Sequence, residues 1–202
     1  MTNRPGRSAS AIILAGGLAT RMGGEKPLRR LHGTTLLDLA LDLARTACDD
    51  LIVACGARLF SVPTGVRLAP DADADHGKGP LAGVRAGLEL ARHERVLVLA
   101  CDLPNITPPL AAALLGHLPA HGCVWCRHGA DEPLVAALLR EPAAVAVDQA
   151  LAQGRNKVLP VWQVLNPLVI TGEALAAFGD PAKLFANINT PADLSAQENG
   201  PA

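Results

Sequence analysis

Short apolar runs that alternate with segments of helical periodicity are the feature that most constrains how this chain can fold. The first run, residues 11–15, is apolar throughout and is typical of a strand that is buried on both faces. Strands of this kind that are joined by helices predict a mostly parallel sheet with helices on both sides. We therefore expect an α/β fold, a three-layer α/β/α sandwich with a Rossmann-like central sheet.

The individual elements are predicted from apolar periodicity, turn residues and capping residues. Strands are expected at residues 10–14, 51–55, 66–68, 95–100, 123–128, 134–138 and 185–188, with 123–128 and 134–138 near the sheet edge. Helices are expected at 36–47, capped by Thr34 or Thr35, and at 80–91, 108–118, 143–152 and 191–196. A chain of 202 residues is most simply one domain, placed here at 10–197 with flexible tails at 1–9 and 198–202.

Charge and hydropathy exclude several classes of partner. The formal net charge is −1, so the basic footprint of a nucleic-acid-binding protein is missing and no nucleic-acid partner is expected. No apolar stretch near the N-terminus is long enough for a signal peptide or a membrane span. We therefore expect no membrane association and a cytoplasmic location.

The five cysteines predict buried thiols more strongly than a metal site. An odd number without a secretory signal is typical of reduced thiols in the cytosol. Cys123 and Cys126, flanked by His121 and His128, have the spacing of half a zinc site. However, strand alternation places the two thiols on opposite faces of the sheet, which favours structural roles.

A glycine loop with two cations follows the first strand. Gly16 and Gly17 leave backbone amides bare, as an anionic phosphate requires, and Arg21 and Lys26 can neutralise further phosphates. The spacing matches neither the Gly-Lys-Ser/Thr loop nor the dinucleotide-binding fingerprint. An ordinary glycine turn with solvated basic residues is the alternative.

Three of the candidate residues follow strands and should therefore meet. Ligands of such folds bind beyond the carboxyl ends of the strands, which places Gly16, Asp71 and Asp102 together. Asp102 ends an apolar strand, where a carboxylate is costly unless it meets a cation, and magnesium with a triphosphate is the natural partner. The alternative is a turn aspartate ahead of Pro104. Asp73 and Asp75 are expected to be solvated loop residues.

Four motifs carry a resemblance to a known family. They are Leu-Ala-Gly-Gly-x-x-x-Arg-Met-Gly-Gly-x-Lys at 14–26, Asp71 with Gly-Pro-Leu-Ala-Gly at 79–83, the strand end Cys-Asp-Leu-Pro at 101–104, and Asn-Ile-Asn-Thr-Pro at 187–191. Together they resemble the nucleotidyltransferase superfamily, and within it the molybdenum cofactor guanylyltransferases. The similarity runs from about residue 10 to 194, nearly the whole chain.

The resemblance implies a reaction and its residues. GMP would pass from GTP to the phosphate of a molybdopterin-type cofactor with release of pyrophosphate, Asp102 would hold Mg²⁺, and Arg21, Lys26 and Asp102 would be catalytic. The GTP-binding residues would be Leu14, Ala15, Gly16, Gly17, Arg21, Lys26, Asp71, Gly79, Pro80, Leu81, Gly83 and Asp102. The second substrate would meet Asn187 and Asn189, which share a face if 185–188 is a strand, and Arg155 in a basic loop. Cofactor-insertion proteins or molybdoenzymes would be protein partners.

Three alternatives remain open from the sequence. The first is cytidylyl transfer to the same cofactor, although the family's cytidylyl branch usually has Ala where Gly16 stands. The second is NTP transfer to another small phosphorylated substrate. The third is a silent nucleotide-binding partner of a larger assembly, which the intact Arg21, Lys26 and Asp102 disfavour.

Overall fold

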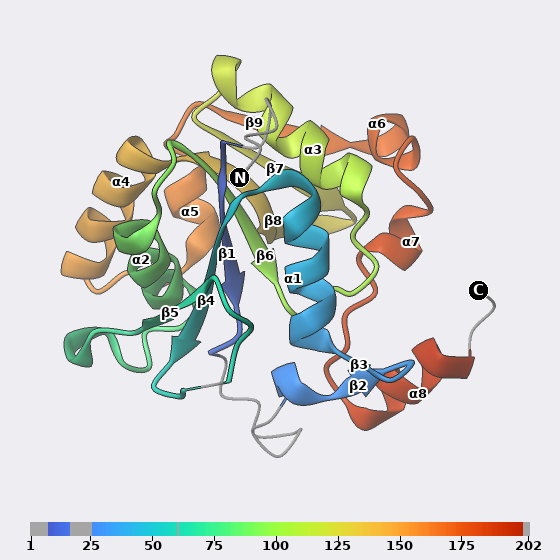
Figure 1. Cartoon of the computed structure of the whole chain (residues 1–202). Helices are drawn as coiled ribbons and strands as arrows, with labels where there is room; N and C mark the ends of the chain where they lie inside the picture. The colour runs from blue at the N-terminus through green and yellow to red at the C-terminus, as the bar shows by residue number, and fades with distance from the viewer. Residues whose placement is uncertain (1–7, 17–25, 60, 200–202) are drawn as a thin grey trace.

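Seven strands form one sheet in the order β5-β4-β1-β6-β8-β7-β9 (Figure 1). This computed structural model describes residues 8–16, 26–59 and 61–199. The strands of the sheet are β1 (Ser10–Leu14), β4 (Asp50–Gly56), β5 (Val66–Pro70), β6 (Arg95–Ala100), β7 (Cys123–His128), β8 (Ala130–Leu139) and β9 (Pro167–Thr171). Only β8 runs antiparallel to its neighbours, so the expected mostly parallel sheet is confirmed.

Helices cover both faces of this sheet, as the sequence predicts. Alternate strand residues point to opposite faces, so Ile12 packs in one apolar cluster and Ile13 in the other. The face of Ile12 is covered by α2 (Pro80–Leu90), α4 (Arg140–Ala152) and α5 (Val158–Trp162). The face of Ile13 is covered by α1 (Leu36–Ala47) and α3 (Pro108–His117) (Figure 1). The three-layer α/β/α arrangement is therefore confirmed.

A small hairpin joins the sheet's carboxyl edge to α1. It consists of β2 (Arg30–Leu31) and β3 (Thr34–Thr35), and follows the short 3-10 helix η2 (Lys26–Leu28). His32 and Gly33 both have positive φ, the backbone that a two-residue hairpin turn requires. Thr35, one of the two expected caps, accepts a hydrogen bond from the Asp38 amide and begins α1.

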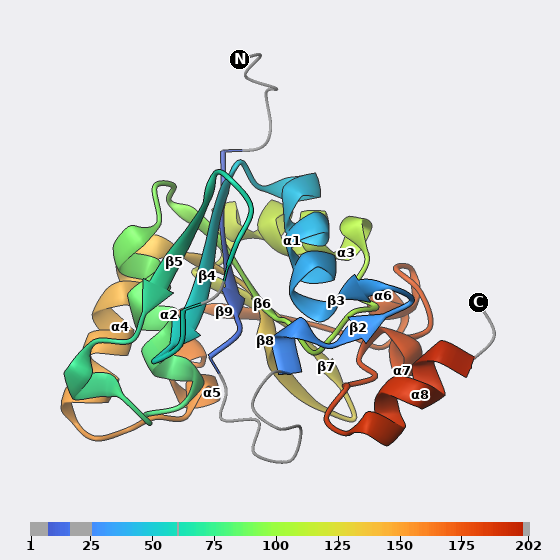
Figure 2. The same cartoon turned by 60° about the horizontal axis from the view of Figure 1, so that its bottom comes forward.

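The C-terminal segment returns to the same edge of the sheet. It contains α6 (Gly172–Ala176), α7 (Pro181–Leu184) and α8 (Pro191–Asn199), and α8 lies beside β2 in Figure 2, which brings this edge forward. Ile188 is fully buried against Leu31 and Leu36 in a third apolar cluster. This cluster fastens the C-terminal segment to the hairpin and to the start of α1.

Several sequence predictions differ from the structure. Residues 185–188 form no strand, because the segment is fixed by the burial of Ile188 and by its amide, which donates to the Asp102 carbonyl. The edge strand is β9, which pairs in parallel with β7 and was not predicted, and neither were α5, α6 and α7. Packing also begins earlier than expected, at the buried Ala9, and α8 continues past residue 197.

Cys123 and Cys126 lie on opposite faces of the sheet, as alternation predicts. Cys123 packs with the cluster under α2 and α4, and Cys126 packs with the cluster under α1 and α3. All five cysteines are free and buried. Within the described ranges, no group of three or more His, Cys, Asp or Glu side chains has an arrangement that could hold a metal ion.

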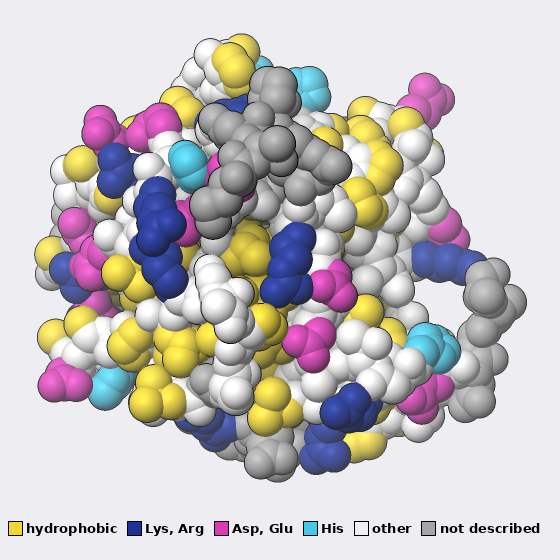
Figure 3. Space-filling model, in the orientation of Figure 1, with side chains coloured by type: hydrophobic (Ala, Val, Ile, Leu, Met, Phe, Trp, Pro, Cys, Tyr) yellow, Lys and Arg dark blue, Asp and Glu magenta, His cyan; other side chains and the backbone are white. Residues whose placement is uncertain are grey.

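Within the same ranges, no helix combines the length and the apolar character needed to cross a membrane. On the face seen in Figure 3, Lys and Arg side chains are interspersed with Asp and Glu instead of forming one basic field.

Candidate active site

Lys26 and Asp102 form the centre of the candidate site. Asp102 follows β6 and Lys26 begins η2, and Lys26 Nζ donates to Asp102 Oδ2 over 2.6 Å. Lys26 Nζ also donates to Asn189 Oδ1 over 2.8 Å. The two charged side chains are only 13% and 24% exposed, so each stabilises a charge that would be costly to desolvate alone.

The C-terminal segment supplies the rest of this centre. With the Asn187 amide oriented to satisfy its neighbours, its nitrogen lies 3.2 and 3.3 Å from the two Asp102 carboxylate oxygens. The backbone amide of Ile188 donates to the Asp102 carbonyl over 2.9 Å. Asn187 and Asn189 thus lie in one cluster with Asp102 and Lys26, although the shared strand face predicted for them does not exist.

The turn after Asn189 is held by the start of α8. Asp193 Oδ2 accepts from the backbone amides of Asn189 and Thr190, each over 2.8 Å, and Thr190 Oγ1 accepts from the Asp193 amide. These amide hydrogen bonds hold the pKa of the Asp193 carboxyl below its usual range. The cap therefore fixes the backbone that presents the Asn189 amide to Lys26.

Gly16 makes the close backbone contact that its lack of a side chain permits. A Cβ added to Gly16 would lie 2.5 Å from the Gly56 nitrogen, and Gly56 itself has φ of +64°. The Ala15 amide donates to the Ala54 carbonyl, which carries the pairing of β1 and β4 to their carboxyl ends. Gly17 and Arg21, which the sequence also assigns to phosphate binding, lie outside the described residues.

Asp71 lies on the same edge, at the end of β5. Its amide donates to the Gly56 carbonyl over 3.1 Å, while its Oδ1 atom is buried and has no hydrogen-bond partner among the described residues. Burial raises the pKa of this carboxyl, while the nearby His76 opposes the rise and the Asp75 charge adds to it. A buried acceptor without a donor is costly, and a ligand N–H or O–H group would satisfy it.

Several other predicted nucleotide contacts surround Asp71. A Cβ on Gly83 would lie 3.2 Å from a Leu14 methyl group and 3.9 Å from Asp71 Oδ1, so Leu14, Gly83 and Asp71 adjoin one another. Gly79 and Pro80 begin α2 beside them, with Gly79 at φ of +73°. Leu81 is different, because its side chain is fully buried in the core.

The structure corrects the expectation for Asp75. Asp73 is exposed, as predicted, but Asp75 is only 3% exposed and is paired with Lys78 and Arg85. The alternation of Asp with Ala does not distinguish Asp73 from Asp75. The two cations that pair with Asp75 lie later in the sequence.

Arg155 is not brought into contact with the centre. It follows Gly154 at the end of α4, where its amide donates to the Ala150 carbonyl over 2.8 Å, and its side chain is exposed. Among the described residues, no hydrogen bond or ion pair links its side chain to Lys26 or Asp102.

Glu132 is a site residue that the sequence did not reveal. β6 pairs with β8 up to Leu99 opposite Val135, and the same antiparallel register continued past the end of β6 brings Glu132 level with Asp102. Burial raises the pKa of the Glu132 carboxyl, and the Asp102 charge raises it further. Only the strand pairing, not any motif, places this carboxylate here.

Comparisons with known proteins identify the family of the chain. Residues 11–166 match the family of MobA-like NTP transferase domains. A molybdenum cofactor guanylyltransferase from Pseudomonas paraeruginosa is 40% identical over 187 residues, which cover 90% of this chain and 90% of the relative. The resemblance deduced from the four motifs is therefore confirmed.

Solved structures share the fold over most of the chain. Molybdopterin-guanine dinucleotide biosynthesis protein A from Archaeoglobus fulgidus matches with a TM-score of 0.74 and 26% identity, over 94% of this chain and 96% of that chain. A protein from Mycobacterium tuberculosis H37Rv in complex with manganese matches with a TM-score of 0.57 and 21% identity, over 82% of this chain and 89% of that chain. This chain belongs to the family of MobA-like NTP transferase domains.

Proposed function

We propose that this chain transfers GMP from GTP to the terminal phosphate of molybdopterin and releases pyrophosphate. The observation that carries the proposal is the convergence of Lys26, Asp102 and Asn189 at the carboxyl edge of the sheet. A cation, a carboxylate and amide groups beside a glycine loop are the components that phosphate chemistry requires. The molybdenum cofactor guanylyltransferase from Pseudomonas paraeruginosa, which is 40% identical to this chain, supports the choice of reaction.

The reaction needs alignment and charge compensation more than covalent help. A phosphate oxygen of molybdopterin forms a bond to the α-phosphorus of GTP, and the bond from that phosphorus to the bridging oxygen of pyrophosphate breaks. Lys26 and Arg21 draw negative charge from the triphosphate, and the amides of Gly16 and Gly17 cradle it. The parts given to Arg21 and Gly17 rest on the sequence motif alone.

The nucleoside would lie on the β1, β4 and β5 side of the edge. Asp71 offers a buried oxygen without a donor, which suits an N–H or O–H group of the base or ribose. The GTP-contacting set comprises Leu14, Ala15, Gly16, Gly17, Arg21, Lys26, Asp71, Gly79, Pro80, Leu81, Gly83 and Asp102. Leu81 takes part through its backbone, because its side chain is in the core.

Mg²⁺ is the metal that this chemistry favours. The carboxylate of Asp102 is a hard oxygen ligand of the kind that Mg²⁺ takes together with phosphate oxygens, so this residue fits the ion. When bound, the ion supplies positive charge next to the reacting phosphates. Asp102 would hold it, and Lys26 would then be free to exchange Asp102 for a phosphate oxygen.

The second substrate would approach from the C-terminal segment. Asn187 and Asn189 already face Asp102 and Lys26, and we assign them to the molybdopterin phosphate side. Arg155 remains a candidate for the same substrate from its exposed loop. Cofactor-insertion proteins or molybdoenzymes would receive the product.

We place the reaction in the cytoplasm, a reducing compartment in which the five free thiols would persist.

Binding of GTP, CTP, ATP and UTP with Mg²⁺, measured by calorimetry on the purified chain, tests the proposal first. A clear preference for GTP, followed by pyrophosphate release only when molybdopterin is added, is the expected result. Preference for CTP would move the chain to cytidylyl transfer. Binding of GTP without pyrophosphate release under any condition would indicate a silent nucleotide-binding protein.

A further inference from the structure

The loop between β5 and α2 carries a buried ion-pair network that the proposed chemistry does not use. Asp75, in the 3-10 helix η3 (Asp73–Asp75), accepts from Lys78 Nζ over 2.8 Å and from Arg85 over 2.6 Å. Its side chain is 4% exposed, whereas the side chains of its two partners are about one third exposed. These hydrogen bonds hold the pKa of the Asp75 carboxyl below its usual range.

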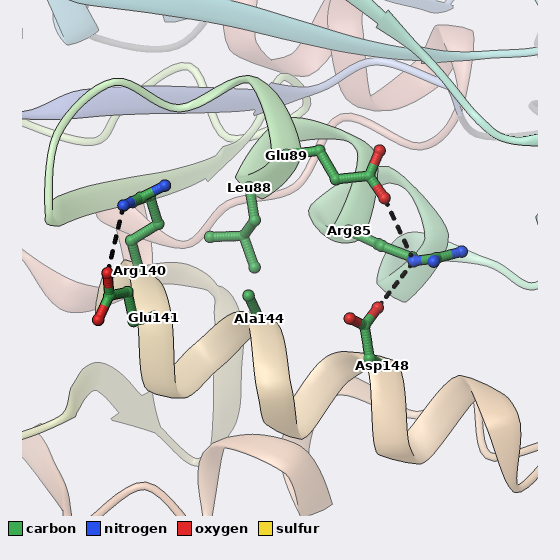
Figure 4. Close-up of a pocket in the computed structure, with 7 residues that line it drawn as sticks. All are labelled: Arg85, Leu88, Glu89, Arg140, Glu141, Ala144 and Asp148. Carbon is green, nitrogen blue, oxygen red and sulfur yellow. Dashed lines mark hydrogen bonds and ion pairs between the residues drawn. The ribbon is translucent and has the colours of Figure 1, made fainter.

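Arg85 extends the network beyond the loop. It lies on α2, and its Nε atom is 2.8 Å from Asp148 Oδ1 on α4 and 3.5 Å from Glu89 Oε1 on its own helix (Figure 4). This contact closes one end of a groove of about 210 Å³ between α2 and α4. One guanidinium therefore ties the loop to both helices of this layer.

The loop that is tied in this way begins and ends at predicted nucleotide contacts. Asp71 stands at its start and Gly79 at its end. Gly77 and Gly79 both have positive φ, a backbone that glycine adopts freely, so these two residues do little by themselves to fix the course of the loop. Inside the loop, the Asp75 amide donates to the Ala72 carbonyl and the Lys78 amide donates to the Asp75 carbonyl. Asp75 thus stabilises the turns of the loop through its backbone and attaches the loop to α2 through its side chain.

We propose that the Asp75–Arg85 ion pair is a positioning device that sets the loop from Asp71 to Gly79 for nucleotide recognition. The inference rests on the proposed function, in which Asp71 and Gly79 meet the nucleoside. Without the pair, the loop keeps its covalent ends but loses its fixed distance to α2, so the buried Asp71 oxygen no longer stands at one place. A hydrogen bond from the nucleotide to the Asp71 oxygen weakens steeply when that oxygen moves by about 1 Å. The resulting loss of affinity depends on which base is bound.

Substitutions separate this role from a contribution to folding. Arg85→Gln removes the pair but leaves Lys78 beside Asp75, so the buried carboxylate keeps one cation and the variant should fold. Asp75→Asn removes the charge and keeps the shape. Asp73→Asn is the matched control, because the Asp73 side chain is fully exposed in the same loop, and Asp148→Asn removes only the outer contact of Arg85.

The experiment measures dissociation constants for GTP and CTP with Mg²⁺ by calorimetry, and KM and kcat in the pyrophosphate assay. Asp75→Asn and Arg85→Gln should weaken GTP binding about tenfold, narrow the ratio of GTP to CTP affinity, and raise KM with kcat changed less than about threefold. Arg85→Lys should restore most of the affinity, and both control variants should stay within about twofold of the unaltered chain.

Two results would overturn the inference. One is GTP affinity in a folded Asp75→Asn variant that equals that of the Asp73→Asn control. The other is an equal loss of affinity for GTP and CTP that is proportional to the loss of thermal stability across the variants. That result would indicate a structural role alone. If the unaltered chain prefers CTP, the guanylyl assignment fails, and the same variants test the positioning role with CTP. If the unaltered chain binds no nucleotide, both proposals fail.

Discussion

Lys26 Nζ lies 2.6 Å from Asp102 Oδ2, although 76 positions separate the two residues in the sequence. The contact joins the segment after the glycine loop to the end of the strand that lies next to β1. Each charge is the other's counterion in this structure, and both lie at the edge where parallel strands end. In the proposed reaction, phosphate would then compete with Asp102 for Lys26, and a metal would compete with Lys26 for Asp102.

Asp102→Asn should lower kcat for GMP transfer by at least about 10²-fold, which corresponds to roughly 3 kcal/mol of transition-state stabilisation. The amide keeps the size of the side chain but not the negative charge that holds a cation. Steady-state pyrophosphate release at saturating GTP, repeated over a range of Mg²⁺ concentrations, measures the effect. Full activity with Mg²⁺, in a variant whose melting temperature is unchanged, would remove Asp102 from the metal site.

Lys26→Ala should raise KM for GTP about tenfold or more and also slow turnover, since a charge-assisted hydrogen bond to phosphate is lost. Among the described residues, the Asn187 amide is then the remaining side-chain hydrogen-bond donor to the Asp102 carboxylate. Lys183→Ala is the control, because Lys183 is an exposed lysine on α7, and its kinetics should not change. Identical kinetic constants for the two variants would exclude Lys26 from the phosphate site.

Gly16→Ala should disturb the active-site edge more than the fold. The new Cβ would stand 2.5 Å from the Gly56 nitrogen, and backbone atoms cannot give way as the end of a side chain can. We expect the free energy of unfolding to fall by about 1–3 kcal/mol. We expect the fractional loss in the free energy of GTP binding to exceed the fractional loss in the free energy of unfolding.

Gly116→Ala is the matched control for that substitution. Gly116 lies in α3 with nothing within 4 Å of its added Cβ, so alanine should stabilise the protein by about 0.5–1 kcal/mol. Urea unfolding of both variants, beside GTP calorimetry, gives the comparison. Gly16→Ala with unaltered GTP affinity would show that the close approach to Gly56 is not needed for the nucleotide.

The apolar strand runs predicted the centre of the sheet well, because a strand buried on both faces leaves an unmistakable pattern. The run of β6 and the start of β1 are of this kind. β9 escaped prediction because it is an edge strand with mainly half-buried residues, and periodicity is weak where one side meets solvent. At residues 185–188 the error was the reverse: the sequence predicted a strand that the structure lacks. The segment is held instead by the burial of the Ile188 side chain.

The candidate site shows the same division. The rule that ligand sites lie at the carboxyl ends of strands predicted a common edge for Gly16, Asp71 and Asp102, but it did not predict the contact of Lys26 with Asp102. The burial of Asp75 depends on Arg85 folding back from the next helix, and the place of Glu132 depends on strand register. Both are long-range consequences of packing, which local sequence patterns do not contain.

Asp50 should make stability depend on pH at the opposite edge of the sheet. Burial alone raises the pKa of this carboxyl, but hydrogen bonds from the Ser10 hydroxyl, the Arg92 amide and Arg67 outweigh it and hold the pKa below its usual range. A depressed pKa contributes stability that is present above the unfolded-state pKa of about 3.9 and is lost as the pH falls through the folded-state pKa.

Asp50→Asn should therefore cost about 2 kcal/mol at pH 7 and flatten the loss of stability below about pH 4. Urea unfolding at a series of pH values measures both effects. Asp42→Asn is the control, since Asp42 forms an exposed ion pair with Arg45 and the substitution should change stability by less than about 0.5 kcal/mol. Equal acid sensitivity in the unaltered chain and in Asp50→Asn would contradict the assignment.

The thiols should be inert in the native protein. Burial raises the pKa of Cys48, Cys101 and Cys126 to about 12 and also raises the pKa of the other two cysteines. At pH 8 the thiolate fraction of a group with that pKa is about 10⁻⁴, and access is blocked as well. Ellman's reagent should detect no fast-reacting thiol before denaturation and all five after it. A native thiol that reacts within seconds would contradict the burial of the cysteines. Zinc that remains bound to the purified chain through Cys123 and Cys126 would contradict the placement of these two residues on opposite faces of the sheet.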